Sequence, residues 1–412
     1  MKYHDVAGVA HKAAIMHRPD DRPVNLLLED VCLPAVAVKS QSLENNITWM
    51  QRYADARGVS LAPHGKTTMT PWIFRRQTAL GAWAIGVGSA WQASVAMQSG
   101  ARRVLMVNQL VGRANMQLVS RLKNDYPACH FFCCVDSEAN ASALSTFFAA
   151  RGQRLDILIE LGVPGGRCGC RTSEEAEALA ERVTTLPGLT LHGIELYEGV
   201  IHDEDPRPRV EQLLRDAAAL ALSFSRHQWV KGEMILTGAG SSWYDVVCNI
   251  WHETPLPDGC RLVIRPGCYV THDGGIYQQA QDAVMARDPI ACGLGGDLLS
   301  ALELIAMVQS VPEPGRAVVN FGKRDSAFDA GLPQPVAHYR QGQALPFTPG
   351  AFTTVDIMDQ HAMLTLVPGS EVQVGDILVF TTSHPCLTFD KWKMLFLIDS
   401  DYNVLEEMET CF

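Results

Sequence analysis

Eight short apolar segments recur along the first two thirds of the chain, and stretches with helical periodicity separate most of them. Strands that alternate with helices form parallel β-α units, and eight such units match a closed barrel better than an open sheet. The sequence therefore predicts an α/β fold with a (β/α)8 barrel of the TIM type. The segments are SLAPHGK (60–66), WAIGVGS (83–89), RVLMVNQ (103–109), HFFCCVDS (130–137), LDILIELGV (155–163), TLHGIELYEG (190–199), EMILTGAGS (233–241) and RLVIRPGCYV (261–270).

Beyond about residue 290 the pattern changes to short strand-like segments separated by Gly, Pro and Asp, such as GRAVVNFG and DILVFTT. Little helical periodicity remains there, which indicates a β-rich domain. We expect a barrel domain over 30–285 and a C-terminal β domain over 286–412, with one strand contributed by residues before about 45.

Composition narrows the class of function. The chain has 412 residues, a net charge of -11 and no long cluster of Lys or Arg, which argues against a nucleic-acid-binding surface. The N-terminal segment lacks the apolar core of a signal peptide, and no run of 18 apolar residues occurs. Twelve cysteines without a C-x-x-C pair are expected to stay reduced. These features favour a cytoplasmic enzyme that acts on a small molecule and contacts neither nucleic acid nor membrane.

Polar, glycine-containing segments fall at the ends of the expected strands: PHGKTT, GVPGGRCG, YEGVIHD, TGAGSSWYD and RPGCYVTHD. Any one of them could be a simple turn. In β/α barrels, however, the chemistry gathers at the carboxyl ends of the strands, so five such segments at one end indicate a site. Lys66, after the first strand, is then either a surface amine or a lysine that forms a Schiff base with a carbonyl cofactor.

The order of these segments resembles the pyridoxal-phosphate enzymes of the alanine-racemase-like fold (fold type III), and most closely the branch of D-threonine aldolases and eukaryotic-type D-serine dehydratases. In that branch the cofactor lysine lies in a motif close to PHxKT, which is Pro63 to Thr67 here. The resemblance extends from about residue 30 to SHPCLTFDKW near the C-terminus. It implies pyridoxal phosphate held by Lys66, a C-terminal β domain and a homodimer.

The resemblance also implies a set of cofactor residues. The backbone N–H groups and serine hydroxyls of TGAGSS suit a phosphate. By comparison with alanine racemases, Arg265 would face the pyridine nitrogen and Gly267 the phosphate, although the aldolase and dehydratase branch varies at this arginine. A guanidinium there would leave the ring nitrogen unprotonated and weaken the electron sink. The expected cofactor residues are Lys66, Arg167, Tyr197, Thr237, Gly240, Ser241, Ser242, Arg265, Gly267 and Tyr269.

His384 and Cys386 are the candidate metal ligands. On an extended segment, residues two apart point to the same side. The related D-serine dehydratases bind zinc through a His and a Cys in this motif, whereas the aldolases carry His and Asp and use other divalent ions. Thiolate with imidazole favours Zn²⁺ over the harder Mn²⁺ or Mg²⁺, and two protein ligands leave positions open for water and substrate.

The expected activity is therefore a zinc-dependent dehydration of D-serine or a related D-3-hydroxy amino acid to a 2-oxo acid and ammonia. Lys66 would remove the α-proton, and zinc would polarise the β-hydroxyl. The nearest alternative is a metal-dependent D-threonine aldolase, with His64 or another histidine as the base that deprotonates the β-hydroxyl. An alternative of another class is a non-enzymatic carrier of pyridoxal phosphate, but the known carriers lack a C-terminal β domain.

Overall fold

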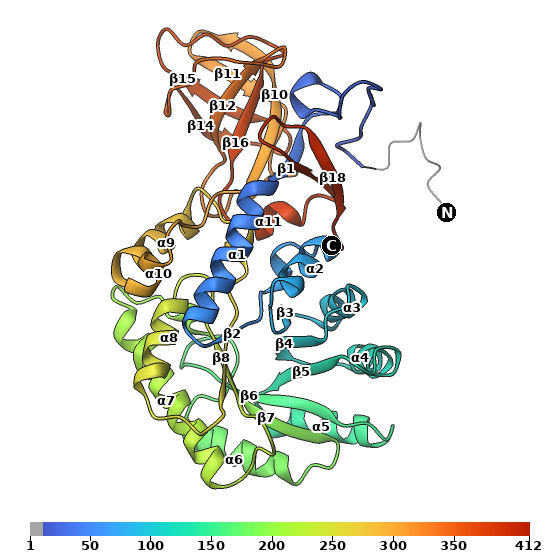
Figure 1. Cartoon of the computed structure of the whole chain (residues 1–412), viewed down its shortest axis with the longest axis vertical. Coiled ribbons are helices and arrows are strands. Elements are labelled where there is room, and N and C mark those ends of the chain that lie inside the picture. Colours follow the sequence, from blue (N-terminus) through green and yellow to red (C-terminus); the bar gives the residue numbers. More distant parts are fainter. Residues whose placement is uncertain (1–10) are drawn as a thin grey trace.

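The computed structural model describes residues 11–412 and contains a barrel with a β-rich domain at one end (Figure 1). The barrel strands are all parallel and follow the order β2-β9-β8-β7-β6-β5-β4-β3. A parallel bridge between His64, just after β2, and Gly86 in β3 closes the ring. The predicted eight-stranded barrel is confirmed. Its strands are β2 (Ser60–Leu61), β3 (Ile85–Val87), β4 (Arg103–Gln109), β5 (His130–Val135), β6 (Leu155–Leu161), β7 (Leu189–Leu196), β8 (Ile235–Gly238) and β9 (Arg261–Ile264).

Helices connect the strands and cover the outside of the barrel (Figure 1). Their starts follow from local chemistry, because Ser89, Ser137 and Thr172 each accept a hydrogen bond from the backbone N–H three residues later. No helix within residues 11–412 has the length and apolar character needed to cross a membrane. The helices are α1 (Ser40–Ala56), α2 (Pro71–Ala79), α3 (Ala90–Gln98), α4 (Arg113–Asp125), α5 (Glu138–Ala149), α6 (Ser173–Thr184), α7 (Arg207–Arg226), α8 (Tyr244–Glu253), α9 (Ile276–Arg287) and α10 (Pro289–Gly293).

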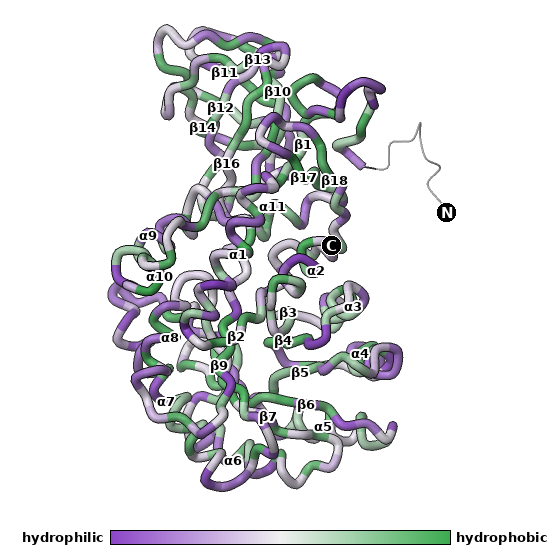
Figure 2. Tube along the Cα trace, viewed as in Figure 1, coloured by the Kyte–Doolittle hydropathy of each residue, from purple (hydrophilic) through white to green (hydrophobic). Residues whose placement is uncertain are grey.

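The two faces of the barrel strands bury different layers. Leu105, Leu158 and Val263 belong to a separate cluster inside the ring, whereas Val104 and Met106, on the opposite face of β4, join the larger core under the helices. This alternation is the two-residue period of a strand. Figure 2 shows the contrast between the hydrophobic strands and the hydrophilic outer helices such as α4. The barrel interior is therefore packed, and a ligand can enter only at the strand ends.

The second domain is rich in β-strands, as the sequence predicts, and most of its strand pairs are antiparallel. Strand β1 (Ala35–Lys39) lies in this sheet, antiparallel to β10 and parallel to β17. The chain therefore starts in the β domain, forms the barrel and returns. The remaining strands are β10 (Leu302–Glu313), β11 (Arg316–Val319), β12 (Gln334–Arg340), β13 (Gln343–Ala344), β14 (Phe352–Ile357), β15 (Ala362–Leu366), β16 (Ile377–Thr381), β17 (Met394–Ile398) and β18 (Val404–Glu409), with the short helix α11 (Cys386–Phe389) between β16 and β17.

Candidate active site

A pocket of about 130 Å³ lies at the carboxyl ends of the barrel strands. Its wall combines the loops after β2, β6, β7, β8 and β9 with the segment 384–386 of the second domain. Both domains therefore build one cavity. The structure brings together most of the residues expected from the sequence: Lys66, Arg167, Tyr197, Gly240, Ser241, Arg265, Gly267, His384 and Cys386.

Three expected cofactor residues do not line this pocket. The Thr237 hydroxyl is fully buried and donates to the carbonyl of Val263 at 3.0 Å. Tyr269 is buried in the core, where its hydroxyl accepts a hydrogen bond from Gln77 at 3.0 Å. Ser242 lines the adjoining hollow next to the pocket. Thr237 and Tyr269 therefore support the walls of the site from behind.

Lys66 lies in the 3-10 turn Gly65–Thr67 directly after β2, and its side chain is exposed to the pocket. Its amine has no hydrogen-bond or ion-pair partner among residues 11–412, as a lysine that must bind a carbonyl carbon requires. The backbone N–H of Lys66 donates to Nδ1 of His64 at 3.4 Å. Burial, together with the positive charges of Lys66 and Arg265, holds the pKa of His64 well below its usual value. His64 is therefore neutral.

Backbone donors suited to a phosphate converge near Ser241. The N–H groups of Gly267 and Cys268 both donate to Oγ of Ser241, at 3.3 and 3.2 Å. The backbone comes this close because residue 267 is glycine: a Cβ there would lie 2.6 Å from Oγ1 of Thr67. Paired N–H groups of this kind form an anion-binding concavity. The free amine of Lys66 and this donor pair both fit pyridoxal phosphate.

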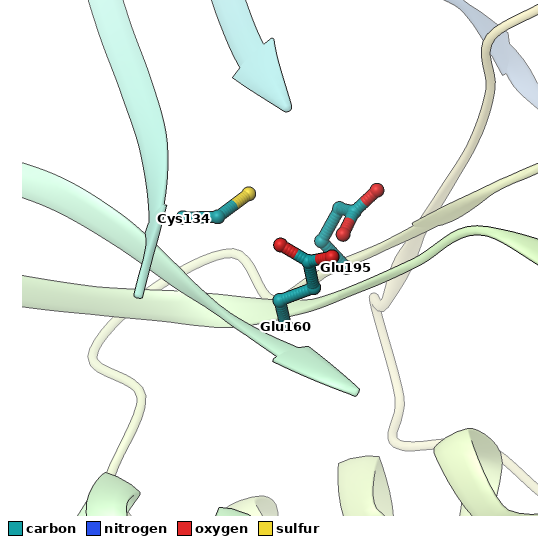
Figure 3. A group of neighbouring side chains, drawn as sticks. All are labelled: Cys134, Glu160 and Glu195. Atoms are coloured by element: carbon teal, nitrogen blue, oxygen red, sulfur yellow. The ribbon is translucent and has the colours of Figure 1, made fainter. Parts of the chain in front are cut away.

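Arg265 lies at the base of the pocket on a buried carboxylate. Its Nη2 donates to Oε1 of Glu195 at 2.5 Å and to the carbonyl of Leu196 at 2.6 Å, and the side chains of Arg265 and Glu195 are almost completely buried. Glu195 lies in turn within 4.8 Å of Glu160 and Cys134, and Figure 3 shows the three side chains pointing toward one another. This group contains neither of the metal ligands expected from the sequence.

Burial and the charge of Arg265 act in opposite directions on the protonation of this group. Burial raises the pKa of Glu195 to about 8, although Arg265 opposes the shift, and burial also raises the pKa of Glu160. Burial therefore favours the protonated form of both carboxyl groups, while the guanidinium of Arg265, which is hydrogen-bonded to Glu195, favours the charged form of Glu195. Because a guanidinium already supplies the positive charge, we interpret the cluster as a support for Arg265 and not as a cation site.

Arg167 and Tyr197 form another part of the wall. The guanidinium of Arg167 stacks on the ring of Tyr197, 4.6 Å from its centroid. Burial, followed by the nearby Glu198, raises the pKa of Tyr197, so its hydroxyl stays protonated. Both residues face the cavity beside Lys66, in agreement with the cofactor-lining position implied by the resemblance.

His384 and Cys386 enter the pocket from the second domain, but their segment is not extended. His384 has a left-handed backbone (φ 57°), and Cys386 begins α11. The backbone N–H of His384 donates to Asp273 at 3.0 Å, and its Nδ1 lies 2.6 Å from Oδ2 of Asp329. Cys386 and then Asp329 raise the pKa of His384 to about 9, while Cys268 and His384 lower that of Cys386.

This arrangement fits a metal. A carboxylate on one ring nitrogen of a histidine is the usual companion of metal ligation by the other nitrogen. Metal binding requires deprotonated ligands, and the neighbours of Cys386 favour its thiolate form. His384 and Cys386 thus have the chemistry expected of zinc ligands.

Several residues of the site were not expected from the sequence. Tyr277 and Cys268 line the pocket, and Asp329 and Glu195 support it from behind. Cys268 lies within RPGCYVTHD and Glu195 within TLHGIELYEG, two segments that the sequence analysis singled out. Nothing in the sequence indicated which of their side chains face the pocket. Asp329 is 55 residues from His384 along the chain, and no local pattern relates the two.

The fold and the site together define a pyridoxal-phosphate enzyme of the alanine-racemase-like, fold-type III class. The chain belongs to the family described as "Alanine racemase, N-terminal domain", which matches residues 38–245. A second family, described as "Putative serine dehydratase domain", matches residues 301–398, which include the metal-ligand candidates.

Two curated relatives span most of the chain. A D-threonine aldolase from Arthrobacter sp. is 27% identical over 368 residues, 88% of each chain. A D-threo-3-hydroxyaspartate dehydratase from Delftia sp. is 28% identical over 375 residues, which cover 86% of this chain and 91% of the relative. One of these relatives is an aldolase and the other a dehydratase. The same two activities occur among the solved structures with a similar fold.

Among those solved structures, a D-threonine aldolase from Filomicrobium marinum has a TM-score of 0.76 and 24% identity, and the match covers 95% of this chain and 98% of that one. A metal-free variant of the Delftia dehydratase, with a cysteine replaced by alanine, has a TM-score of 0.71 and 21% identity, with 94% and 99% covered. In a further variant of that dehydratase, the histidine two residues before this cysteine is replaced.

Proposed function

We propose that this protein is a pyridoxal-phosphate- and zinc-dependent dehydratase of D-serine or a related D-3-hydroxy amino acid, which forms a 2-oxo acid and ammonia. One observation carries the proposal: a single pocket contains the free amine of Lys66 and the carboxylate-backed pair His384 and Cys386. The first is suited to the α-carbon of an amino acid, and the second to an oxygen on its β-carbon.

Lys66 would hold the cofactor, with Ser241 and the N–H groups of Gly267 and Cys268 around its phosphate. Pyridoxal phosphate supplies an electron sink for the negative charge that develops at the α-carbon. The amine of Lys66, once free, is the base that takes the α-proton, since it is the only unpaired amine in the described wall of the pocket. Arg265, fixed by Glu195, keeps a positive charge at the base of the site.

His384 and Cys386 would hold zinc, which supplies Lewis-acid polarisation of a hydroxyl leaving group. Asp329 orients the imidazole, and the hydrogen bond from the His384 backbone to Asp273 holds the left-handed turn that brings the two side chains together. This assignment is supported by the D-threo-3-hydroxyaspartate dehydratase structures, in which a cysteine and the histidine two positions before it have each been replaced, the cysteine variant being described in a metal-free form.

An aldolase remains the second candidate, because D-threonine aldolases are among the relatives. It would need a base for the β-hydroxyl. His64 lies in the pocket, but its Nδ1 accepts the backbone N–H of Lys66, so the neutral ring carries its hydrogen on Nε2 and offers a donor there. This tautomer and the presence of Cys386 favour the dehydratase. The carrier hypothesis is disfavoured because the β domain contributes His384 and Cys386 to the pocket.

The remaining features of the proposal come from the resemblance and the acidic composition. They are a homodimeric enzyme in the cytoplasm, with a small-molecule substrate and no nucleic-acid or membrane partner. Size-exclusion chromatography with light scattering at several protein concentrations tests the dimer directly.

The test of the activity is one incubation of the pyridoxal-phosphate-loaded protein with D-serine and with D-threonine, with and without zinc after chelation. The assay follows 2-oxo acid, ammonia, glycine and aldehyde together. Zinc-dependent 2-oxo acid with equal ammonia is expected. Glycine and aldehyde would instead establish an aldolase. Cys386→Asp tests the role of the thiolate: a variant that remains an equally zinc-dependent dehydratase would show that this ligand does not separate the two reactions.

A further inference from the structure

A second cysteine faces the candidate zinc ligand across the domain boundary. The Sγ atoms of Cys268 and Cys386 lie 3.5 Å apart, although the residues are 118 positions apart in the chain. Cys268 begins the 3-10 turn after β9, and Cys386 begins α11 of the β domain. Both are free thiols and both line the pocket. Each domain therefore contributes one sulfur atom to a direct contact inside the pocket.

The separation matches a shared metal. Two thiolates bound to one tetrahedral zinc at a Zn–S distance of about 2.3 Å are roughly 3.8 Å apart. The observed 3.5 Å is within a few tenths of an ångström of that value. It is far longer than the S–S bond of about 2.0 Å in a disulfide. We propose that Cys268 is a third protein ligand, so that zinc is bound by Cys268, His384 and Cys386.

The surroundings of the two thiols support this assignment. Oγ1 of Thr67 lies 3.4 Å from Sγ of Cys386 and 4.0 Å from Sγ of Cys268. One hydroxyl group is therefore within hydrogen-bonding distance of both sulfur atoms. Tyr277 lines the same pocket as Cys268, and its ring lies against His384 with centroids 6.4 Å apart. Hydroxyl groups around thiolates are typical of the layer that surrounds a metal and its ligands.

Three protein ligands would also leave one coordination position of the zinc open for substrate. Two cysteines and one histidine form an established ligand set of catalytic zinc, with the fourth tetrahedral position open. Resting on the proposed function, this leaves one position for a substrate oxygen, which suits a single β-hydroxyl. A site with only His384 and Cys386 would leave two positions and could chelate a hydroxyl together with a carboxylate. Cys268 would therefore favour substrates without a β-carboxylate.

Zinc-edge X-ray absorption of the full-length zinc-loaded protein tests the ligand set independently of activity. The expected spectrum contains two sulfur scatterers at about 2.3 Å. Cys268→Ser and Cys386→Ser are each expected to retain one, whereas the exposed Cys292→Ser is the matched control and should retain two. Circular dichroism and bound pyridoxal phosphate establish that each variant is folded.

The outcomes separate the inference from the proposed function. One sulfur scatterer in the unmodified protein would overturn the three-ligand site and leave a zinc enzyme. A disulfide between Cys268 and Cys386 in its zinc-loaded form would overturn the three-ligand site and the assignment of Cys386 as well. Failure to bind zinc at all would overturn both. A second readout is affinity: Cys268→Ser should weaken zinc binding by more than the roughly 10- to 100-fold that loss of a ligand's hydrogen-bond partner costs. An unchanged affinity would contradict ligation by Cys268.

Discussion

Nδ1 of His384 lies 2.6 Å from the carboxylate of Asp329, a residue that reaches the site from the loop between β11 and β12. This contact orients the ring and leaves Nε2 free for the proposed metal. This hydrogen bond supports the proposal that His384 is a metal ligand. It can be removed by a substitution of Asp329 that leaves His384 unchanged.

Asp329→Asn should weaken zinc binding by roughly 10- to 100-fold, because the amide holds the imidazole less firmly and lowers its basicity. Competition with a chelator measures the affinity. Saturating zinc should restore much of the activity, since His384 and Cys386 remain. The control is Asp359→Asn, which removes an exposed carboxylate that pairs with Arg324 on the surface of the β domain. Equal zinc affinity in the two variants would contradict the orienting role of Asp329.

Lys66→Ala should abolish the visible absorbance of a protein-bound Schiff base and lower kcat by at least about 10²- to 10⁴-fold, since the variant loses both the attachment and the base. Absorption spectra and kcat measure the two effects separately. Lys231→Ala removes an exposed lysine in the loop before β8 and should change neither. Retention of a Schiff-base spectrum in Lys66→Ala would assign the cofactor to another amine.

Gly267→Ala should weaken the binding of pyridoxal phosphate, because the added Cβ would lie 2.6 Å from Oγ1 of Thr67 and displace the N–H groups near Ser241. Cofactor titration monitored by absorbance gives the affinity. Gly293→Ala is a suitable control, since its Cβ would meet nothing within 4 Å. If both variants bind the cofactor alike, the loop is not a phosphate site.

The raised pKa of the buried Glu195 predicts a dependence of stability on pH. Burial raises the pKa of Glu195 to about 8, so the folded protein keeps a proton that the unfolded chain releases above about pH 4.3. The folded state then binds more protons, and the free energy of unfolding should fall as pH rises from about 4.3 to 8, by up to about 1.4 kcal/mol per pH unit.

Glu195→Gln removes the titrating group and keeps a side chain of the same size beside Arg265, so this part of the slope should disappear. Urea unfolding at pH 5.5 and pH 7.5 measures it, with the exposed Glu181→Gln as control. Parallel slopes in Glu195→Gln and the unmodified protein would show that Glu195 does not keep its proton in this pH range.

The barrel and the position of Lys66 could be predicted because period-two apolar segments and strand-end glycines are local signals. The direction of individual side chains could not. Cys268 and Tyr269 are neighbours, yet the 3-10 turn that contains both points one into the pocket and the other into the core. His384 and Cys386 meet through a left-handed residue and a helix start, which a period-two argument does not describe. Asp329 depended on tertiary structure alone.

Strand β1 lies between β10 and β17, so the polypeptide crosses from one domain to the other twice, once before α1 and once before β10. The lobe that carries His384 and Cys386 is consequently tethered to the lobe that carries Lys66 by two connections. A double tether resists the twisting that a single linker would allow. Two covalent connections therefore constrain the distance between Lys66 and the pair His384 and Cys386, which does not depend only on how well the two domains pack.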